Sequence, residues 1–359
     1  MSGTSMDAID VALVRFEEDS LSLIAYSQLP YADEVRRAVR NLSGDSAIDE
    51  VSNMDAILGS LFADAIQTVL EQTGVKAADV TAIGSHGQTI LHLPDAQPPR
   101  TLQIGDPNII ARWTGIVTVA DFRRMDMAVG GQGAPLAPAF HARYFRTHES
   151  DRVILNVGGI ANITLLPRDP ALDVTGFDTG PGNGLLDDWN QLHNGTPMDR
   201  DCEWAESGTA REDLLWHLLG DPYFELSPPK STGRDYFNLE WLVRYLEAYP
   251  DALPEDVQAT LLLLSAHSIV EAITREAPAT TELYICGGGV HNPRLLKELR
   301  QELPAVKIVS TSALGLHPDA VEAVTFAWLA KQRLDGAPGN LPAVTGARQP
   351  VVLGGIYTP

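Results

Sequence analysis

Cysteine, positive charge and long apolar runs are scarce in this sequence of 359 residues. The only two cysteines, Cys202 and Cys286, lie far apart and without metal-ligand spacing, which argues against a disulfide framework and a zinc site. Lysine and arginine number 26 against 47 aspartates and glutamates, a formal net charge of −21. Nucleic-acid phosphates require a basic face, so we expect no nucleic-acid partner. The four leucines at 261–264 form the longest apolar run, far short of the roughly 20 residues of a membrane helix, so we expect no membrane span.

The length of the chain predicts two domains. A hydrophobic content of 44% with 20% charged residues is ordinary for a soluble globular protein. Because the sequence opens directly on a turn of functional type, we expect no signal peptide and a reducing, cytoplasmic location. Cys286 follows Leu283, Tyr284 and Ile285 and is expected to be a buried strand residue.

Four glycine-rich turns are the strongest signal in the sequence. They cover residues 1–7, 156–162, 178–183 and 287–292, each where a strand should end. Glycine lets backbone N–H groups come close to an anion, and serine and threonine hydroxyls add donors. Several such turns in one chain suggest one polyphosphate held from both sides of a cleft. This pattern predicts a nucleotide-dependent phosphotransferase.

Strand and helix patterns alternate along both halves of the chain, which predicts an α/β fold. The stretch 130–135 is the best domain boundary. The expected strands are 8–16, 21–26, 80–83, 116–120, 152–157, 163–167, 174–177 and 282–286. The expected helices are 51–72 with Gly74 as its C-cap, 184–193, 257–272, and 293–303 with Asn292 as its N-cap.

Asp178 is the best candidate for a general base. A strand-to-helix turn follows it, which would put its carboxylate at the carboxyl edge of a sheet, where ligands of α/β proteins bind. There it can take a proton from an attacking hydroxyl or water. Its alternative role is to cap the following turn. The basic, hydroxyl-rich loop 230–235 is expected to form a wall of the site.

Other candidate side chains each have a structural alternative. His86 can bind a sugar, act as an acid or base, or serve structure alone. Arg123 and Arg124 can neutralise phosphate or a substrate carboxylate, with at least one of them expected on the surface. Glu322 is either a sugar ligand or base, or an ordinary acidic residue at a helix N-terminus. Asp7 can hold Mg²⁺ directly or through water, unless the first turn is a disordered terminus.

Together these segments resemble the anhydro-N-acetylmuramic acid kinases over nearly the whole chain. The matching segments are 1–7, 85–89, 121–123 with 131–135, 156–162, 177–183, 231–234 with 237–238, 287–292 and 341–347. The resemblance implies the sugar kinase, heat-shock ATPase and actin superfamily, with two related ribonuclease-H-like domains, each a mixed sheet flanked by helices, around an ATP cleft. Residues 1–130 plus about 340–359 would carry the phosphate turn and sugar contacts. Residues 131–339 would carry the catalytic aspartate and the adenosine site.

The resemblance also implies the reaction and the site residues. Water opens the 1,6-anhydro ring of the sugar while O6 takes the γ-phosphoryl group of ATP, giving N-acetylmuramic acid 6-phosphate and ADP in peptidoglycan recycling. A homodimer is one possible assembly. Asp178 would be catalytic, and Mg²⁺ would lie near Asp7. The implied sugar ligands are His86, Gln88, Thr89, Arg123 and Glu322. The implied ATP-binding residues are Gly3, Thr4, Ser5, Met6, Asp7, Ala8, Ile9, Asp10, Gly158, Gly159, Asn162, Gly180, Gly182, Asn183, Gly287, Gly288 and Asn292.

The sequence departs from the family pattern in two places. Ala8 stands where the family usually has glycine, and no strand leads into the first turn ahead of Met1. The second departure predicts unpaired backbone groups at an edge of the sheet. A kinase for another sugar and a nucleotide-binding regulator with slow ATPase activity stay open as alternatives. The presence of Asp178, His86 and Glu322 argues against the regulator, which would need only the phosphate turns.

Overall fold

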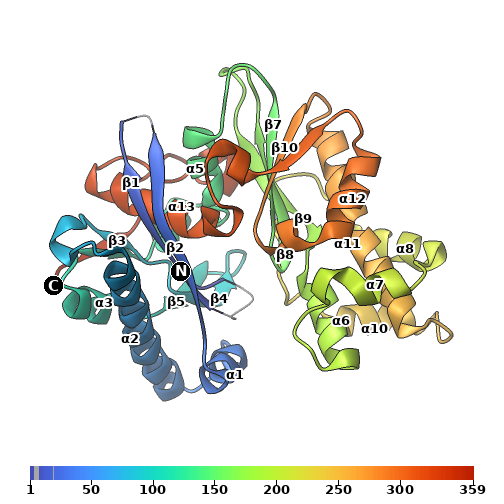
Figure 1. The fold of residues 1–359 in the computed structure, drawn as a ribbon, viewed down its shortest axis with the longest axis horizontal. Helices are drawn as coiled ribbons and strands as arrows, with labels where there is room; N and C mark the ends of the chain where they lie inside the picture. The colour runs from blue at the N-terminus through green and yellow to red at the C-terminus, as the bar shows by residue number, and fades with distance from the viewer. Residues whose placement is uncertain (4–7, 19) are drawn as a thin grey trace. The chain divides into compact units, whose positions relative to one another are not determined.

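The computed structural model describes residues 1–3, 8–18 and 20–359, and these divide into two compact units (Figure 1). Unit 1 comprises Met1–Tyr144 and Ala320–Pro359, and unit 2 comprises Phe145–Asp319. Strands and helices alternate through both, so the predicted α/β class is confirmed. Residues 131–144 and 320–339, which we had placed in the second domain, belong to unit 1. The reason is packing, because α5 (Ala137–Tyr144) lies against α13 (Val321–Leu334), with the rings of Phe140 and Trp328 6.1 Å apart.

Unit 2 is built on one five-stranded mixed sheet in the order β11-β10-β7-β8-β9. The strands are β7 (Arg152–Val157), β8 (Ile160–Leu166), β9 (Thr175–Pro181), β10 (Glu282–Cys286) and β11 (Lys307–Ser310). β7, β8 and β9 form an antiparallel meander, whereas β10 and β11 run parallel to β7. The expected strand 163–167 lies largely within β8, which forms a hairpin with β7. β9 extends four residues beyond the predicted end at 177, so it runs through Asp178.

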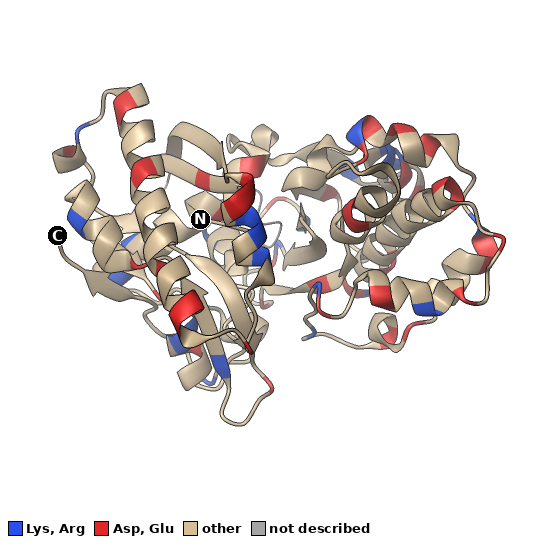
Figure 2. Ribbon diagram, turned by 90° about the horizontal axis from the view of Figure 1, so that it is seen from below, with Lys and Arg blue, Asp and Glu red and all other residues tan. Residues whose placement is uncertain are grey.

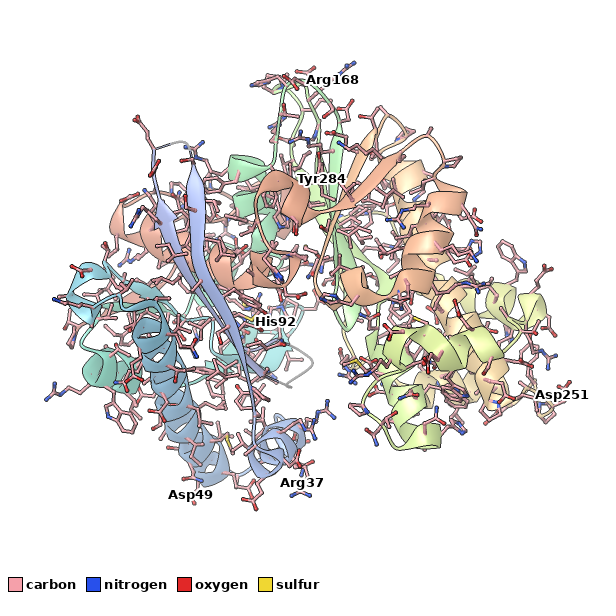
Figure 3. The ribbon with its side chains drawn as sticks, in the orientation of Figure 1. Arg37, Asp49, His92, Arg168, Asp251 and Tyr284 are labelled. Atoms are coloured by element: carbon pink, nitrogen blue, oxygen red, sulfur yellow. The ribbon has the colours of Figure 1, made fainter. Side chains whose placement is uncertain are left out.

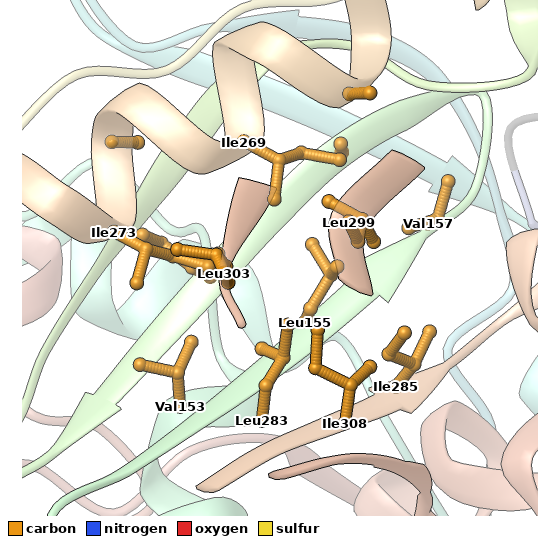
Figure 4. Close-up of a cluster of buried hydrophobic side chains, with 14 of the residues drawn as sticks. Val153, Leu155, Val157, Ile269, Ile273, Leu283, Ile285, Leu299, Leu303 and Ile308 are labelled. Atoms are coloured by element: carbon orange, nitrogen blue, oxygen red, sulfur yellow. The ribbon is translucent and has the colours of Figure 1, made fainter. Parts of the chain in front are cut away.

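Alternation along these strands gives the sheet one apolar and one partly polar face. Val153, Leu155 and Val157 of β7 pack with Leu283 and Ile285 of β10 into a buried cluster (Figure 4). Because successive side chains point to opposite faces, the residues between them face the other way. The cluster is closed by α11 (Pro254–Glu276) and α12 (Pro293–Glu302).

α11 meets the length and composition of a membrane-spanning helix, with a mean hydropathy of 1.4 over its most apolar window. However, 72% of that window is buried inside the protein. α11 is therefore a core helix, whose apolar surface covers the sheet of unit 2.

The remaining α-helices of unit 2 lie between β9 and α11 in the chain. They pack into a second buried cluster around Trp189, Phe237 and Trp241. The α-helices are α6 (Gly184–Asn194), α7 (Glu203–Ser207), α8 (Glu212–Leu219), α9 (Pro222–Glu225) and α10 (Leu239–Leu246). The short 3₁₀ segments are η2 (Arg200–Cys202), η3 (Gly288–His291), η4 (Thr311–Leu314) and η5 (Pro318–Ala320), of which the last reaches into unit 1.

Unit 1 contains shorter sheets. The hairpin β1 (Ala8–Phe16) and β2 (Leu21–Pro30) is antiparallel, as is β4 (Gln88–Leu93) with β5 (Arg100–Ile104). A third sheet has the order β12-β6-β3. Its strands are β3 (Ile83–Gly84), β6 (Thr118–Ala120) and β12 (Gly355–Tyr357). The predicted strand 80–83 was wrong at its start, because the 3₁₀ turn η1 (Ala77–Asp79) delays pairing until Ile83.

Helices cover these sheets. α2 (Ile48–Thr73) ends at Gly74 with φ of 68°, the predicted left-handed C-cap. α2 buries Met54, Leu58 and Phe62 in the core of this unit. The other α-helices here are α1 (Asp33–Asn41), α3 (Pro107–Thr114), α4 (Arg123–Ala128) and α14 (Pro342–Thr345), in addition to α5 and α13.

An open slot separates β1 from β3 in unit 1. Among the described residues, β1 pairs only with β2, and β3 only with β6, so each presents an edge without a strand partner. A cavity of about 730 Å³ lies between these strands, lined also by α2 and α13. Met1 and Asp10 exchange both backbone hydrogen bonds, at 2.9 and 2.8 Å, so Met1 sits beside β1 at the slot. The expected unpaired edge is therefore present.

Charged residues are spread along the ribbon rather than gathered in one segment (Figure 2). Some are paired across neighbouring strands. In unit 2, Arg152 donates to Glu282 at 2.7 Å and lies 5.3 Å from the ring centre of Tyr284, which is labelled in Figure 3. The acidic composition thus describes the solvated surface and gives no specific indication of a ligand.

Candidate active-site residues

Asp178 lies inside β9, the edge strand of the unit 2 sheet, and not at the end of a strand as predicted. Its backbone N–H donates to the carbonyl of Lys230 at 3.2 Å. Its carboxylate Oδ2 accepts from the backbone N–H of Thr232 at 2.9 Å. The loop after α9 therefore covers the free edge of β9. Since the carboxylate bonds to this loop, we see no support for the alternative that it caps the turn after it.

The surroundings of Asp178 suit a proton acceptor. Burial raises the pKa of its carboxyl to about 7, and the Thr232 N–H and the charge of Lys230 act in the opposite direction. A base whose pKa lies close to the working pH combines the correct protonation state with proton-transfer driving force. Asp178 can thus accept a proton at neutral pH and release it again.

A polar row crosses the sheet beside Asp178. β-sheet register places Asn162 opposite Asp178, and Asn156 opposite Asn162. Directly paired residues share one face, so Asn156 and Asn162 lie on the face opposite the apolar cluster of Figure 4. We had not predicted a role for Asn156. The signal was available, because Asn156 alternates with the buried Leu155 and Val157.

The predicted phosphate turns of unit 2 hold each other. Gly182 and Gly184 donate their N–H groups to the carbonyl of Gly159 at 3.0 Å, and Asn183 donates to that of Gly158 at 2.8 Å. A Cβ on Gly182 would lie 2.5 Å from the Gly158 carbonyl oxygen. These glycines therefore allow two turns to approach closely, and several of their amides already have partners.

The triple glycine has two different functions in the structure. A Cβ on Gly287, which has φ of 75°, would lie 2.3 Å from Asn156 Oδ1, and one on Gly289 would lie 2.3 Å from Val157 Cβ. These two glycines are required for packing on β7. Gly288 is exposed, and its nearest neighbour would be Asn183 Nδ2 at 3.7 Å. Gly288 is thus the position with room for a ligand. Asn292 caps α12 by accepting from Leu295 N–H, as predicted.

In unit 1, His86 and Arg123 are hydrogen-bonded to each other. The Arg123 guanidinium donates to His86 Nε2 at 2.8 and 3.2 Å, and His86 Nδ1 lies 3.0 Å from the Gly87 carbonyl oxygen. Because a guanidinium only donates, Nε2 must be unprotonated and Nδ1 must carry the proton. Burial, followed by the charge of Arg123, holds the pKa of His86 well below its ordinary value. His86 is therefore a neutral acceptor that orients Arg123, which argues against an acid role.

Arg123 and Glu322 belong to the same group of charges. Arg123 also donates to the Gly133 carbonyl at 2.8 Å, and burial lowers its pKa to about 10, so it stays cationic at neutral pH. Glu322, in the first turn of α13, lies on the exposed side of the helix. Its side chain reaches solvent, but protein atoms surround the carboxyl group, and this desolvation and the charge of Asp10 raise its pKa to about 6, against the opposing charge of Arg123, which leaves it ionised at pH 7. Arg124, by contrast, is exposed and pairs with Asp121, as we expected for one of the two arginines.

The other unit 1 predictions have visible local contacts. Gln88 accepts from the Ser2 hydroxyl at 2.6 Å, and Thr89 accepts from Gln103 at 3.2 Å. Asp10 accepts from Tyr26 at 2.5 Å, while Ala8 and Ile9 are buried in β1. Gly3 has open space where a Cβ would stand. The described residues do not include Thr4, Ser5, Met6 or Asp7, the last of which is the predicted Mg²⁺ ligand.

Asp126 is a further buried carboxylate that we had not predicted. It accepts from Gly133 N–H at 2.8 Å, from Asn340 at 2.6 Å and from Thr345 at 2.8 Å. A Cβ on Gly131 would lie 2.1 Å from Asp126 Oδ2. Asp126 therefore joins the segments around Gly133 and Thr345, which are distant in sequence, and helps to hold α4 in place.

Comparisons with known proteins identify the family of the chain. A family model described as anhydro-N-acetylmuramic acid kinase matches residues 1–359. Proteins of that name from Coxiella burnetii and Shewanella halifaxensis are 50% and 49% identical, over 99% of this chain and 96% and 97% of theirs. A solved activator of 2-hydroxyisocaproyl-CoA dehydratase from Clostridium difficile covers 91% of this chain and 98% of its own, at 10% identity and a TM-score of 0.41.

Proposed function

The chain belongs to the anhydro-N-acetylmuramic acid kinase family and is an ATP-using sugar kinase of peptidoglycan recycling, and we propose that Asp178 is its general base. A water molecule gives a proton to the Asp178 carboxylate as its oxygen bonds to C1 of the sugar. The C1–O6 bond breaks, and O6 takes the γ-phosphoryl group of ATP, releasing ADP. The products are N-acetylmuramic acid 6-phosphate and ADP.

The observation that carries this role is the position of Asp178. Its carboxylate is fixed by the Thr232 N–H at 2.9 Å, and its pKa is raised to about 7. A base of this kind typically contributes about 10²–10⁴-fold in rate. The neighbouring Asn162 and Asn156 offer amide groups that can orient the attacking water from the same face of the sheet.

Arg123 and Glu322 are the proposed sugar ligands. Arg123 is held by His86 and Gly133, so its remaining donors have a fixed direction toward a lactyl carboxylate or a hydroxyl of the sugar. Glu322 is ionised and accessible, and accepts from sugar hydroxyls. His86 acts through Arg123, while Gln88 and Thr89 support the same segment through Ser2 and Gln103.

ATP is proposed to bind along the glycine turns. Gly3 and Gly288 have the open backbone that close approach of a phosphate or an adenine requires, whereas Gly158, Gly159 and Gly182 shape the turns behind. Mg²⁺ would be held by Asp7, with Asp10 as the described carboxylate that follows the same turn. Mg²⁺ needs only one or two carboxylates beside phosphates and water, which fits this set, and it would offset charge on the transferred phosphoryl group.

Mass spectrometry in ¹⁸O-water tests the reaction. The protein is incubated with ATP and anhydro-N-acetylmuramic acid, and the product is fragmented. We expect ¹⁸O at C1 and phosphate on O6. Unlabelled C1, or consumption of ATP without a sugar phosphate, would instead favour a kinase for another sugar or a slow ATPase.

A cytoplasmic homodimer is the proposed state of the enzyme. Both known substrates of the reaction, ATP and a recycled sugar, fit a cytoplasmic location. Light scattering of the purified protein measures the molecular mass directly, and a mass near 38.8 kDa would show a monomer instead.

A further inference from the structure

Asp178 belongs to a closed ring of contacts with Tyr223 and Lys230 within unit 2. The hydroxyl of Tyr223 donates to the backbone carbonyl of Asp178 at 2.7 Å. The ammonium of Lys230 donates to the backbone carbonyl of Tyr223 at 3.1 Å and lies 4.6 Å from the centre of its ring. The carbonyl of Lys230 in turn accepts from Asp178 N–H at 3.2 Å. These three residues fix one another's positions.

A buried carboxylate anchors this set on the side away from Asp178. Asp221, at the N-terminus of α9, is 4% exposed and accepts four hydrogen bonds. The donors are Tyr223 N–H at 2.9 Å, the Tyr236 hydroxyl at 2.7 Å, the Trp241 indole at 2.9 Å and the Tyr245 hydroxyl at 3.0 Å. Tyr223 therefore has little freedom to move, and Lys230 rests on a rigid support.

Lys230 is the unusual member of the set. Its side chain belongs to a residue that is only 7% exposed, yet among the described residues no carboxylate oxygen lies within 4.0 Å of its ammonium. Its hydrogen bond goes to a neutral carbonyl. Burying an ammonium without a direct ion pair destabilises a fold, and an apolar side chain of similar length would pack there at lower cost. A purely structural role therefore explains Lys230 poorly.

We propose that Lys230 is a positioning residue for Asp178, whose cation favours the ionised, proton-accepting carboxylate while its main chain holds β9 in place. This inference rests on the proposed role of Asp178 as general base. An opposite charge close to a carboxyl group in a poorly solvated setting stabilises the charged form. The absence of a direct ion pair matters, because a tight contact would block the carboxylate from its water.

The charges around the pair are few. Lys230 favours the ionised form of Asp178. The Tyr223 hydroxyl is the other titratable group that interacts with Asp178, whose charge raises the pKa of Tyr223. From α11, Arg275 opposes the positive charge of Lys230, while Glu271 and Glu276 favour it. Burial lowers the pKa of Lys230 to about 8, so it is still protonated at neutral pH. A change at Lys230 should thus affect Asp178, together with the charges of Arg275, Glu271 and Glu276 on α11.

The test is the pH dependence of kcat/KM for Lys230→Met and Lys230→Arg. Removing the cation raises the pKa of Asp178, so the acidic limb of the profile should move to higher pH in Lys230→Met. We expect about a tenfold loss near pH 6.5 for each unit of movement, with recovery above pH 8. Lys230→Arg keeps the charge and should keep the limb within a few tenths of a unit of wild type.

Two further variants separate positioning from folding. Tyr223→Phe removes the hydrogen bond to the Asp178 carbonyl but keeps the cation, so it should lower kcat without moving the limb. If Lys230→Met fails to bind ATP or loses its thermal transition, Lys230→Gln, which retains a donor for the Tyr223 carbonyl, is measured in the same way.

The outcomes are distinct. A limb that stays in place in both Lys230→Met and Lys230→Gln overturns this inference. Full activity of Asp178→Asn would overturn the proposed function instead, because that variant has no base whatever Lys230 does. An inactive Asp178→Asn together with an unmoved limb in the lysine variants would leave the proposed function standing and remove Lys230 from it.

Discussion

The two units handle their functional charges in different ways. Unit 1 gathers both signs, with Arg123, Glu322 and Asp10 acting on one another and neutral His86 orienting the arginine. Unit 2 keeps Asp178 apart from any ion pair and supports it by a backbone N–H and a cation beyond 4.0 Å. Compensated charges bind polar ligands without changing protonation. An uncompensated carboxyl group with a pKa near 7 is suited to moving a proton.

Their sheets differ in the same sense. The unit 2 sheet is continuous across five strands, and Asp178 lies on an edge strand that a loop covers. In unit 1, the slot between β1 and β3 interrupts the sheet beside Met1. The proposed base, Asp178, thus lies in the continuous sheet, whereas Met1 lies beside the interrupted one.

Asp178→Asn should have the largest effect on turnover, and it tests the proposed role of unit 2 in proton transfer. We expect kcat to fall about 10²–10⁴-fold, because Asn keeps the shape but cannot accept the proton. ATP affinity should stay nearly unchanged. Steady-state kinetics and nucleotide titration measure the two quantities. Asp173→Asn, a change at an exposed residue of the same unit, is the control and should behave as wild type. Near wild-type turnover in Asp178→Asn would contradict its role as base.

Glu322→Ala should act on binding rather than on proton transfer. We expect the sugar KM to rise roughly tenfold, because the lost hydrogen bonds to a charged acceptor weaken the binding free energy of the sugar by about 1–2 kcal/mol. Less sugar phosphate should form per ATP consumed. The same substitution at the exposed Glu71 of α2 is the matched control. Unchanged sugar kinetics would return Glu322 to the ordinary role of an acidic residue at a helix N-terminus.

Filling the slot in unit 1 should stabilise it. Met1 already pairs with Asp10, so six apolar residues joined to its amino group would run antiparallel to β1 and face residues 11–16. Each apolar side chain that becomes buried contributes about 1.5–3 kcal/mol before the entropy of ordering is subtracted. We expect the melting temperature to rise by about 5 °C or more, and ATP to bind more tightly.

Thermal melts and nucleotide titrations of three chains test the slot. They are the chain as given, the apolar extension, and a glycine-serine extension of the same length. Equal values for all three would mean that the slot does not accept a strand. An equal gain from both extensions would show that only the buried amino group of Met1 matters.

The smallest effect concerns pH and His86. Its folded-state pKa lies below its unfolded value, so the stability it contributes is present above about pH 6.5 and is lost as pH falls further. Between the folded and unfolded pKa values the slope approaches about 1.4 kcal/mol per pH unit. His86→Gln should therefore show a shallower fall of melting temperature between pH 7 and 5 than wild type. His148→Gln, at an exposed position, should follow the wild-type curve.

Local patterns predicted several elements and their ends, although others, among them α10, β4 and β5, were not expected. The boundaries of β1 and β10, the C-cap at Gly74 and the N-cap at Asn292 agree with the sequence, because periodicity, glycine and asparagine act over a few residues. The strand 80–83 failed, since pairing with β6 and not local composition decides where β3 begins. Asp178 was identified as a residue, but its position inside β9 depends on pairing with β8.

By itself, the sequence determined the α/β class, the glycine turns and the identity of the candidate acid, base and sugar ligands, because these depend on residue type and short spacing. Only the tertiary structure decided that Glu322 joins Arg123 in unit 1, that His86 is a neutral acceptor, and that Lys230 lies buried near Asp178. Those properties depend on desolvation and on the charges that long-range packing brings together. Neither quantity can be calculated from neighbours along the chain.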